Sequence, residues 1–143
     1  MKTLIIGGSG FVGSFLIKEL EGYNLTNLDK NPSPFFNNET LIGDIRNFDE
    51  IKIPKGTETI VLLAAEHRDD VSPTSLYYDV NVQGTKNCID LSIEFNAEKF
   101  ILVSTDKAVR PTNVMGASKR ICELYVQNVD SFNTEISAVR FGN

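Results

Sequence analysis

The feature that most restricts the fold of this chain is a glycine-rich turn between a short apolar segment and a helical repeat. The apolar segment is Leu4–Ile6, and glycines follow it at positions 7, 10 and 13. Next, apolar residues recur at helical spacing: Phe11, Val12, Phe15, Leu16 and Leu20. We therefore expect a strand, a tight turn and a helix at the start of the chain.

The rest of the chain repeats this alternation of strand and helix. Further strands are expected at residues 25–28, 40–42, 59–63, 100–103 and 136–139. A long helix is expected to have an inner face formed by Val80, Gly84, Cys88, Leu91 and Phe95. Another helix is predicted over Asn113–Asn128, with an inner face of Ile121, Leu124 and Tyr125. Because alternating strands and helices favour right-handed crossovers, we predict an α/β fold with a doubly wound parallel sheet of about six strands.

Length and composition limit the class of protein. The chain has 143 residues, 41% of them apolar and 23% charged, which suits one globular domain over residues 1–143. Its net charge of −5 argues against nucleic acid or an anionic membrane as a partner. We find no secretory signal and no apolar run near the ~20 residues of a membrane span, so we expect a cytoplasmic protein.

The cysteines and the single histidine give little sign of metal chemistry. Cys88 and Cys122 lack metal-ligand spacing and are expected to be buried free thiols. His67 stands alone, so we predict no metal site. It either borders a ligand or is a solvated loop residue, and we favour the solvated alternative. The neighbouring residues 68–70 are expected to be charged side chains exposed to solvent.

The glycine spacing suits a turn that holds a dinucleotide diphosphate. Gly7 allows the tight turn, Gly10 lets the backbone approach the phosphates, and Gly13 lets the helix pack close to the strand. Free N–H groups at the helix start would face the phosphates. We therefore expect cofactor contacts along the turn from Gly7, Ser9, Gly10, Phe11, Val12 and Gly13.

Acidic residues end the next two predicted strands. A carboxylate at Asp29 can accept hydrogen bonds from an adenosine ribose and would repel a 2′-phosphate, which favours NAD over NADP. Lys30 beside it softens that preference. Asp44, followed by Ile45, either meets the adenine or caps a helix, and the sequence leaves both roles open.

Four segments together resemble the extended short-chain dehydrogenase/reductase family, whose cofactor domain is a Rossmann fold. They are the glycine turn, Leu63-Ala64-Ala65, Asn81-Val82-Gln83-Gly84-Thr85 and Ser104–Lys119. This similarity covers essentially the whole chain. Ser104–Lys119 and the ending Ala138–Asn143 are similar to the bacterial polysaccharide-biosynthesis branch, whose better-known members are UDP-N-acetylglucosamine 4,6-dehydratases. Residues 64–71 are more similar to the nucleotide-sugar epimerases of the same superfamily.

The resemblance implies an altered catalytic set. Thr105 matches the family's catalytic hydroxyl and Lys119 its lysine, but Met115 stands where the family has a tyrosine. A thioether cannot give or take a proton. Asp106 and Lys107 are then the candidates for proton transfer, with Lys107 as base and Asp106 as acid. The alternative is that these two residues form a plain surface ion pair.

The resemblance also implies NAD as cofactor and a UDP-sugar such as UDP-N-acetylglucosamine as substrate. It adds cofactor contacts at Leu63, Ala64, Ala65, Asn81 and Lys119. The implied dehydration oxidises carbon 4, eliminates water across carbons 5 and 6, and returns hydride to carbon 6. Family members often pair through two long helices, so a homodimer is plausible here.

Three interpretations remain open at this point, because complete enzymes of the family are longer and this chain is expected to lack their substrate domain. The chain is the cofactor-binding part of a nucleotide-sugar 4,6-dehydratase or 4-epimerase, a stand-alone NAD-binding module without turnover, or a remnant that acts only with a partner.

Overall fold

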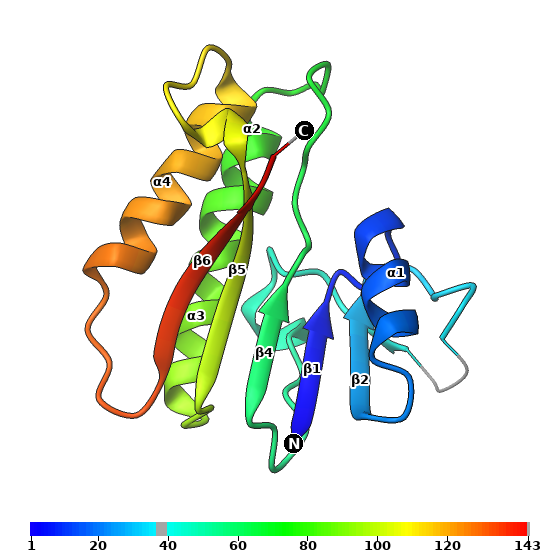
Figure 1. Cartoon of the computed structure of the whole chain (residues 1–143). Helices are drawn as coiled ribbons and strands as arrows, with labels where there is room; N and C mark the ends of the chain where they lie inside the picture. The colour runs from blue at the N-terminus through cyan, green and yellow to red at the C-terminus, as the bar shows by residue number, and fades with distance from the viewer. Residues whose placement is uncertain (37–39, 143) are drawn as a thin grey trace.

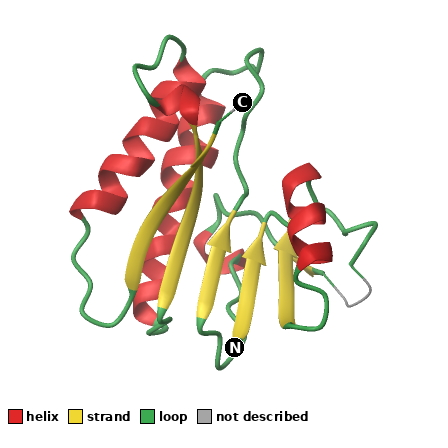
Figure 2. Cartoon of the chain, in the orientation of Figure 1, coloured by secondary structure: helices red, strands yellow, loops and turns green. Residues whose placement is uncertain are grey.

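The computed structural model describes residues 1–36 and 40–142, and its centre is a six-stranded sheet in the order β3-β2-β1-β4-β5-β6. The strands are β1 (Lys2–Ile6), β2 (Asn24–Asp29), β3 (Leu41–Ile42), β4 (Thr59–Leu62), β5 (Lys99–Thr105) and β6 (Glu135–Phe141). All neighbouring pairs are parallel, so the loops after the strands gather at one edge of the sheet (Figure 2). The predicted doubly wound sheet is confirmed.

β1 lies at the centre, where the direction of the chain across the sheet reverses. Leu4 stands opposite Thr26 on β2 and Ile60 on β4. From β1 the chain passes outward to β2 and β3, and it then returns to the other side of β1 to form β4, β5 and β6. Doubly wound sheets bind ligands at the carboxyl ends of the strands beside such a reversal.

Helices connect the strands. They are α1 (Phe11–Glu19), α2 (Ser75–Tyr77), a π-helical turn η2 (Tyr78–Gln83), α3 (Gly84–Glu94) and α4 (Val114–Asn128), with single 3-10 turns η1 (Phe48–Glu50) and η3 (Asp106–Ala108). The predicted long helix is therefore α2, η2 and α3 in succession. In Figure 1, α1 lies beside β1 and β2, and α3 and α4 run along β5 and β6. No helix of the described residues is long and apolar enough to cross a bilayer.

The main core lies between the sheet and the pair α3 and α4. Alternate residues of the strands point into it, among them Leu4 and Leu102, because side chains alternate between the faces of a sheet. Cys88 and Ile89 of α3 and Cys122 of α4 pack against these strands. Both cysteines are free and buried, as predicted.

Three helices are present as predicted, but some of their inner faces differ. In α1, Phe11 and Phe15 are 81% and 58% exposed, and Gly13 and Ile17 are the buried residues. Gly13 and Ile17 meet the glycine turn at Gly8, and the rings of Phe11 and Phe15 lie edge to face on the outside of the helix. Phe95, just after α3, is also exposed and not inward.

The inner face of α4 is more polar than the apolar pattern indicates. Ile121 and Leu124 are 40% and 42% exposed, whereas Tyr125 packs partly against the core. The buried positions are Met115, Gly116, Ser118, Lys119, Cys122, Glu123 and Val126. An assignment made from hydrophobic spacing alone therefore fails for α4, because the helix buries polar residues.

A buried carboxylate joins α4 to β6. Glu123 is 2% exposed, and it accepts hydrogen bonds from the guanidinium of Arg140 at 2.7 and 3.0 Å and from Arg120 at 3.3 Å. The hydrogen bonds from Arg140 lower the pKa of Glu123 to about 2, from an ordinary value of 4.5. The ionised form is thus favoured in the folded protein, and the pair stabilises the fold wherever Glu123 is charged.

We predict that Glu123→Gln lowers the free energy of unfolding by about 2 kcal/mol at pH 7, allowing for the partial exposure of Arg140. The contribution of Glu123 to wild-type stability is present above pH 4.5 and is lost as the pH falls toward about 2. The difference in unfolding free energy between wild type and variant should therefore vanish near pH 2. Urea unfolding at several pH values measures it. Glu135→Gln, on the exposed start of β6, is the control; equal effects of both substitutions would contradict the prediction.

Candidate cofactor-binding and active site

A cavity of about 630 Å³ opens at the carboxyl ends of the strands. It is walled by the ends of β1 and β2, the loops after β3, β4 and β5, and residues of α1 and α4. Most of the predicted site residues line it: Gly7, Ser9, Gly10, Phe11, Val12, Gly13, Asp29, Lys30, Asp44, Ile45, Leu63, Ala64, Ala65, Thr105, Lys107, Met115 and Lys119. Asp106 and Asn81 are not among the lining residues.

Side chains of β2 hold the glycine turn in shape. The N–H of Gly8 donates to Oδ1 of Asn27 at 3.0 Å, and the N–H of Ser9 donates to Oδ2 of Asp29 at 3.0 Å. Gly7 has a φ of +91°, a left-handed conformation that glycine adopts without strain. The turn is therefore tied to the neighbouring strand through its own backbone.

The start of α1 is open toward the cavity. A Cβ on Gly13 would lie 2.4 Å from the Cα of Gly8, so only glycine allows the helix to approach the turn this closely. Among the described residues, no side chain caps the first turn of α1, which follows Gly10. The N–H groups of Phe11, Val12 and Gly13 then lack intrahelical acceptors, and the positive end of the helix dipole attracts an anion.

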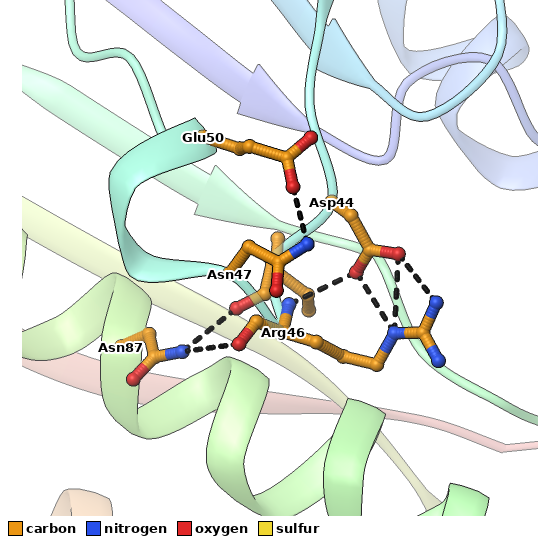
Figure 3. A network of polar contacts seen from close by, with 6 residues as sticks. Asp44, Arg46, Asn47, Glu50 and Asn87 are labelled. Carbon is orange, nitrogen blue, oxygen red and sulfur yellow. Dashed lines mark hydrogen bonds and ion pairs between the residues drawn. The ribbon is translucent and has the colours of Figure 1, made fainter.

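Two carboxylates lie at the ends of β2 and β3. Asp29 also accepts the N–H of Asn31 at 3.0 Å, and its two oxygens retain further acceptor sites. Asp44 accepts the backbone N–H of Arg46 at 2.9 Å and its guanidinium at 2.6 Å (Figure 3). The side-chain hydrogen bond from Arg46 holds the pKa of Asp44 below its usual value. Asn47, not Asp44, occupies the cap position of η1.

The other end of the cavity holds the predicted catalytic residues. Thr105 ends β5; its hydroxyl oxygen accepts the N–H of Lys107 at 3.2 Å and lies 3.2 Å from Oδ1 of Asp106, to which it donates. Lys107 lines the cavity beside Met115, but Asp106 is exposed and stands outside the wall. In the described part of the chain, no ion pair joins Asp106 to Lys107.

Lys119 is the most deeply placed charge of this wall. Its side chain comes from α4, is 5% exposed, and donates through Nζ to the carbonyl of Val103 at 3.2 Å. Burial lowers the pKa of Lys119 below its ordinary value of 10.5, because the charged ammonium loses hydration. A buried lysine beside a reacting centre can hold hydroxyl groups and stabilise developing negative charge.

Asn81, predicted as a cofactor contact, is completely buried behind the cavity wall. Its Nδ2 donates to the carbonyl of Glu66 and to the hydroxyl of Ser118, both at 2.9 Å. Its Oδ1 accepts the N–H of Glu66 at 2.8 Å. The amide thus fixes the loop after β4 to α4 and shapes the wall indirectly.

Several lining residues were missed by the sequence reasoning. They are Asn31, Arg46, Glu66, Arg68 and Ser104. His67, for which a solvated loop position was favoured, also lines the cavity and is exposed. Their position at or shortly after the carboxyl end of a strand is the available signal, since the carboxyl ends of β2–β5 and the loops that follow them all meet the cavity. Asn27 gave no signal, because a single amide inside a weak strand pattern has many possible roles.

We predict that Lys119→Met raises the melting temperature at pH 7 by about 3 °C, because it removes the cost of burying a charge. This cost is largest below the lowered pKa of Lys119 and disappears above 10.5, so the gain should shrink as the pH rises. Lys107→Met, at an exposed position, is the matched control. If the melting temperature of Lys119→Met rises by the same amount at every pH, or by the same amount as that of Lys107→Met, Lys119 is not a buried charge.

Comparison with known proteins places these features in a family. Residues 15–143 match the family described as polysaccharide biosynthesis protein. An Escherichia coli O157:H7 relative, N-acetyl-alpha-D-glucosaminyl-diphospho-ditrans,octacis-undecaprenol 4-epimerase, is 50% identical over 114 residues, covering 78% of this chain and 34% of that protein. A UDP-glucose 4-epimerase of Rickettsia rickettsii is 32% identical over 168 aligned positions, covering 99% of this chain and 49% of that protein.

A solved structure has the same fold. MoeE5 in complex with UDP-glucose and NAD superposes with a TM-score of 0.82 at 23% identity, over 98% of this chain and 53% of that chain. The chain spans about half the length of these relatives, or less. The family match over residues 15–143 agrees with the resemblance found in the sequence. This chain belongs to the polysaccharide biosynthesis protein family.

Proposed function

We propose that this chain is the NAD-binding part of an enzyme that epimerises carbon 4 of a diphosphate-linked sugar. The observation that carries the proposal is the open start of α1, which faces a cavity at the reversal point of a doubly wound sheet. MoeE5 holds NAD and UDP-glucose in the same fold. Both epimerase relatives act, by their names, on a sugar attached to a diphosphate.

The residues at the adenosine end fit NAD. The N–H groups at the start of α1 would bind the diphosphate, and Asp29 would accept the ribose hydroxyls. Asp44 and Ile45 line the cavity, and the N–H of Ile45 has no partner among the described residues. A carboxylate acceptor beside an N–H donor complements the amino group and ring nitrogen along the edge of adenine.

At the sugar end, NAD when bound supplies the acceptor and donor of hydride at carbon 4. Thr105 would hydrogen-bond the hydroxyl at carbon 4, and Lys107 would take its proton and later return it. Lys119 would hold the nicotinamide ribose. Met115 contributes an apolar wall at the position where the family has tyrosine.

Epimerisation fits this wall better than dehydration does. Moving hydride away from carbon 4 and back requires a proton acceptor at one hydroxyl. Dehydration also requires an acid at carbon 6, and Asp106, the predicted acid, stands outside the cavity wall. The alternative is the 4,6-dehydratase, which the segment Ser104–Lys119 favours through its similarity to that branch. A third candidate is NAD binding without turnover.

Pairing of two copies through α3 and α4 stays a prediction. The exposed Ile121 and Leu124 of α4 are apolar residues suited to such a contact.

We predict that the protein binds NAD at least about tenfold more tightly than NADP, because Asp29 repels a 2′-phosphate. Asp29→Asn keeps an oxygen for the N–H of Ser9 and removes the charge, so this preference should fall by about tenfold. Calorimetry with both dinucleotides measures it. Asp49→Asn, an exposed carboxylate of η1, serves as control. An unchanged preference in Asp29→Asn would contradict this role.

The reaction is tested by incubating the protein with NAD and UDP-N-acetylglucosamine, and in parallel with the same sugar on a polyprenyl diphosphate. We expect a product of unchanged mass with inverted carbon 4, separated by chromatography and identified by NMR and mass spectrometry. Loss of water would instead establish the dehydratase. Tight NAD binding without conversion of either substrate would leave the chain as a binding module.

A further inference from the structure

We propose that Asn87 of α3 is a positioning residue for recognition of the adenine base. Its side-chain amide holds the loop of residues 44–46 so that Asp44 and Ile45 present their acceptor and donor at a fixed spacing. The inference rests on the proposed binding of NAD and adds the residue that holds the adenine-facing loop in place.

The hydrogen bonds of Asn87 connect α3 to this loop from behind. The side chain is buried, with 7% exposure, and Nδ2 donates to the carbonyl of Ile45 at 2.9 Å and to that of Arg46 at 3.4 Å (Figure 3). Its Oδ1 accepts from Nε2 of Gln83 at 2.9 Å. Because the two loop groups are carbonyls, which only accept, the NH2 group of Asn87 must face the loop, and its oxygen is left to accept from Gln83.

A second contact, one turn earlier on the helix, fixes the same loop. The side chain of Ile45 is 5% exposed and rests on Gly84, where a Cβ would come within 2.5 Å of its Cδ1. The loop is therefore attached to α3 at Gly84 through packing and at Asn87 through hydrogen bonds. Sliding of the loop along the helix would break both contacts, so together they oppose a shift of the Ile45 backbone.

On the cavity side, Arg46 orients the carboxylate of Asp44. The backbone N–H and the guanidinium of Arg46 both donate to it, and Figure 3 shows these bonds beside those of Asn87. Asn87 donates to the carbonyl of Arg46, so its side-chain amide helps to position the residue that orients Asp44. Neither Asn87 nor Gln83 lines the cavity, so their effect on a ligand passes through the loop.

The experiment compares NAD with nicotinamide hypoxanthine dinucleotide, in which the donor and acceptor along the base edge are exchanged. Both ligands share the diphosphate, the riboses and the nicotinamide, so the ratio of their dissociation constants reports only the base. A loop held in place should prefer NAD by about a hundredfold, because the hypoxanthine leaves both protein groups unpaired. Calorimetry on the folded wild-type protein gives this ratio.

We expect Asn87→Ala to reduce that ratio by about tenfold, through weaker NAD binding. Asn87→Asp should act in the same direction, because a carboxylate has no N–H to donate to the two carbonyls. Asn128→Ala is the matched control. The side-chain amide of Asn128 also donates to a backbone carbonyl, but that carbonyl belongs to Leu124 of its own helix, α4, and not to the loop of residues 44–46. A general loss of stability would weaken both dinucleotides equally and leave the ratio unchanged.

A folded Asn87→Ala protein with the wild-type ratio would overturn the proposal. Should circular dichroism show that this variant does not fold, Gln83→Ala at an exposed position provides the second variant, and it should lower the ratio in the same direction. An unchanged ratio in that variant would count against the proposal. If the wild-type protein binds both dinucleotides equally, the proposal is also overturned, but the proposed binding of NAD is not. Binding of neither would remove the proposed function itself.

Discussion

The candidate site depends on how two side chains of β2 bind the backbone of the glycine turn. Asn27 and Asp29 accept the N–H groups of Gly8 and Ser9, so the turn cannot rotate independently of the sheet. Asn27 is completely buried, and a Cβ on Gly8 would lie 2.3 Å from its Oδ1. This contact, together with the approach of Gly13 to Gly8, aims the start of α1 at the cavity. The proposed position of the diphosphate depends on these constraints.

The two ends of the cavity are built on different principles. At the end proposed for adenosine, backbone groups and carboxylates are held by side chains of β2 and α3 and by Arg46, which suits selective binding. At the other end, Thr105 ends β5, Lys107 follows it in η3, and Lys119 of α4 donates to the carbonyl of Val103. With Met115 in place of a tyrosine, we propose that proton transfer there depends on Lys107. Burial lowers the pKa of Lys119 in the same wall.

The fold class and the family could be predicted from the sequence because both depend on local order. Strand, glycine turn and helix follow one another along the chain, and parallel strands bring their carboxyl ends to one edge. The inner faces of helices were harder, because α4 buries Lys119 and Glu123 toward the sheet and exposes Ile121 and Leu124. Apolar spacing indicates that a helix forms, but it identifies the buried face only where that face is apolar.

The polar contacts between distant elements could not be predicted. Asn27, Asn81 and Asn87 each bind the backbone of a loop that lies far away in the sequence. An amide inside a helix or strand pattern gives no sign of which loop it will meet. The roles assigned to Thr105, Lys107 and Lys119 stay predictions, although the structure brings these residues to one wall.

We propose that the bare amides at the start of α1 hold the diphosphate of a dinucleotide. Titration of the ¹⁵N-labelled protein with NAD, followed by amide chemical shifts, tests this placement. We expect the largest shifts on residues 9–13, with a second group at residues 44–45. Shifts that leave residues 9–13 unmoved, or that concentrate along the outer face of α4, would contradict it.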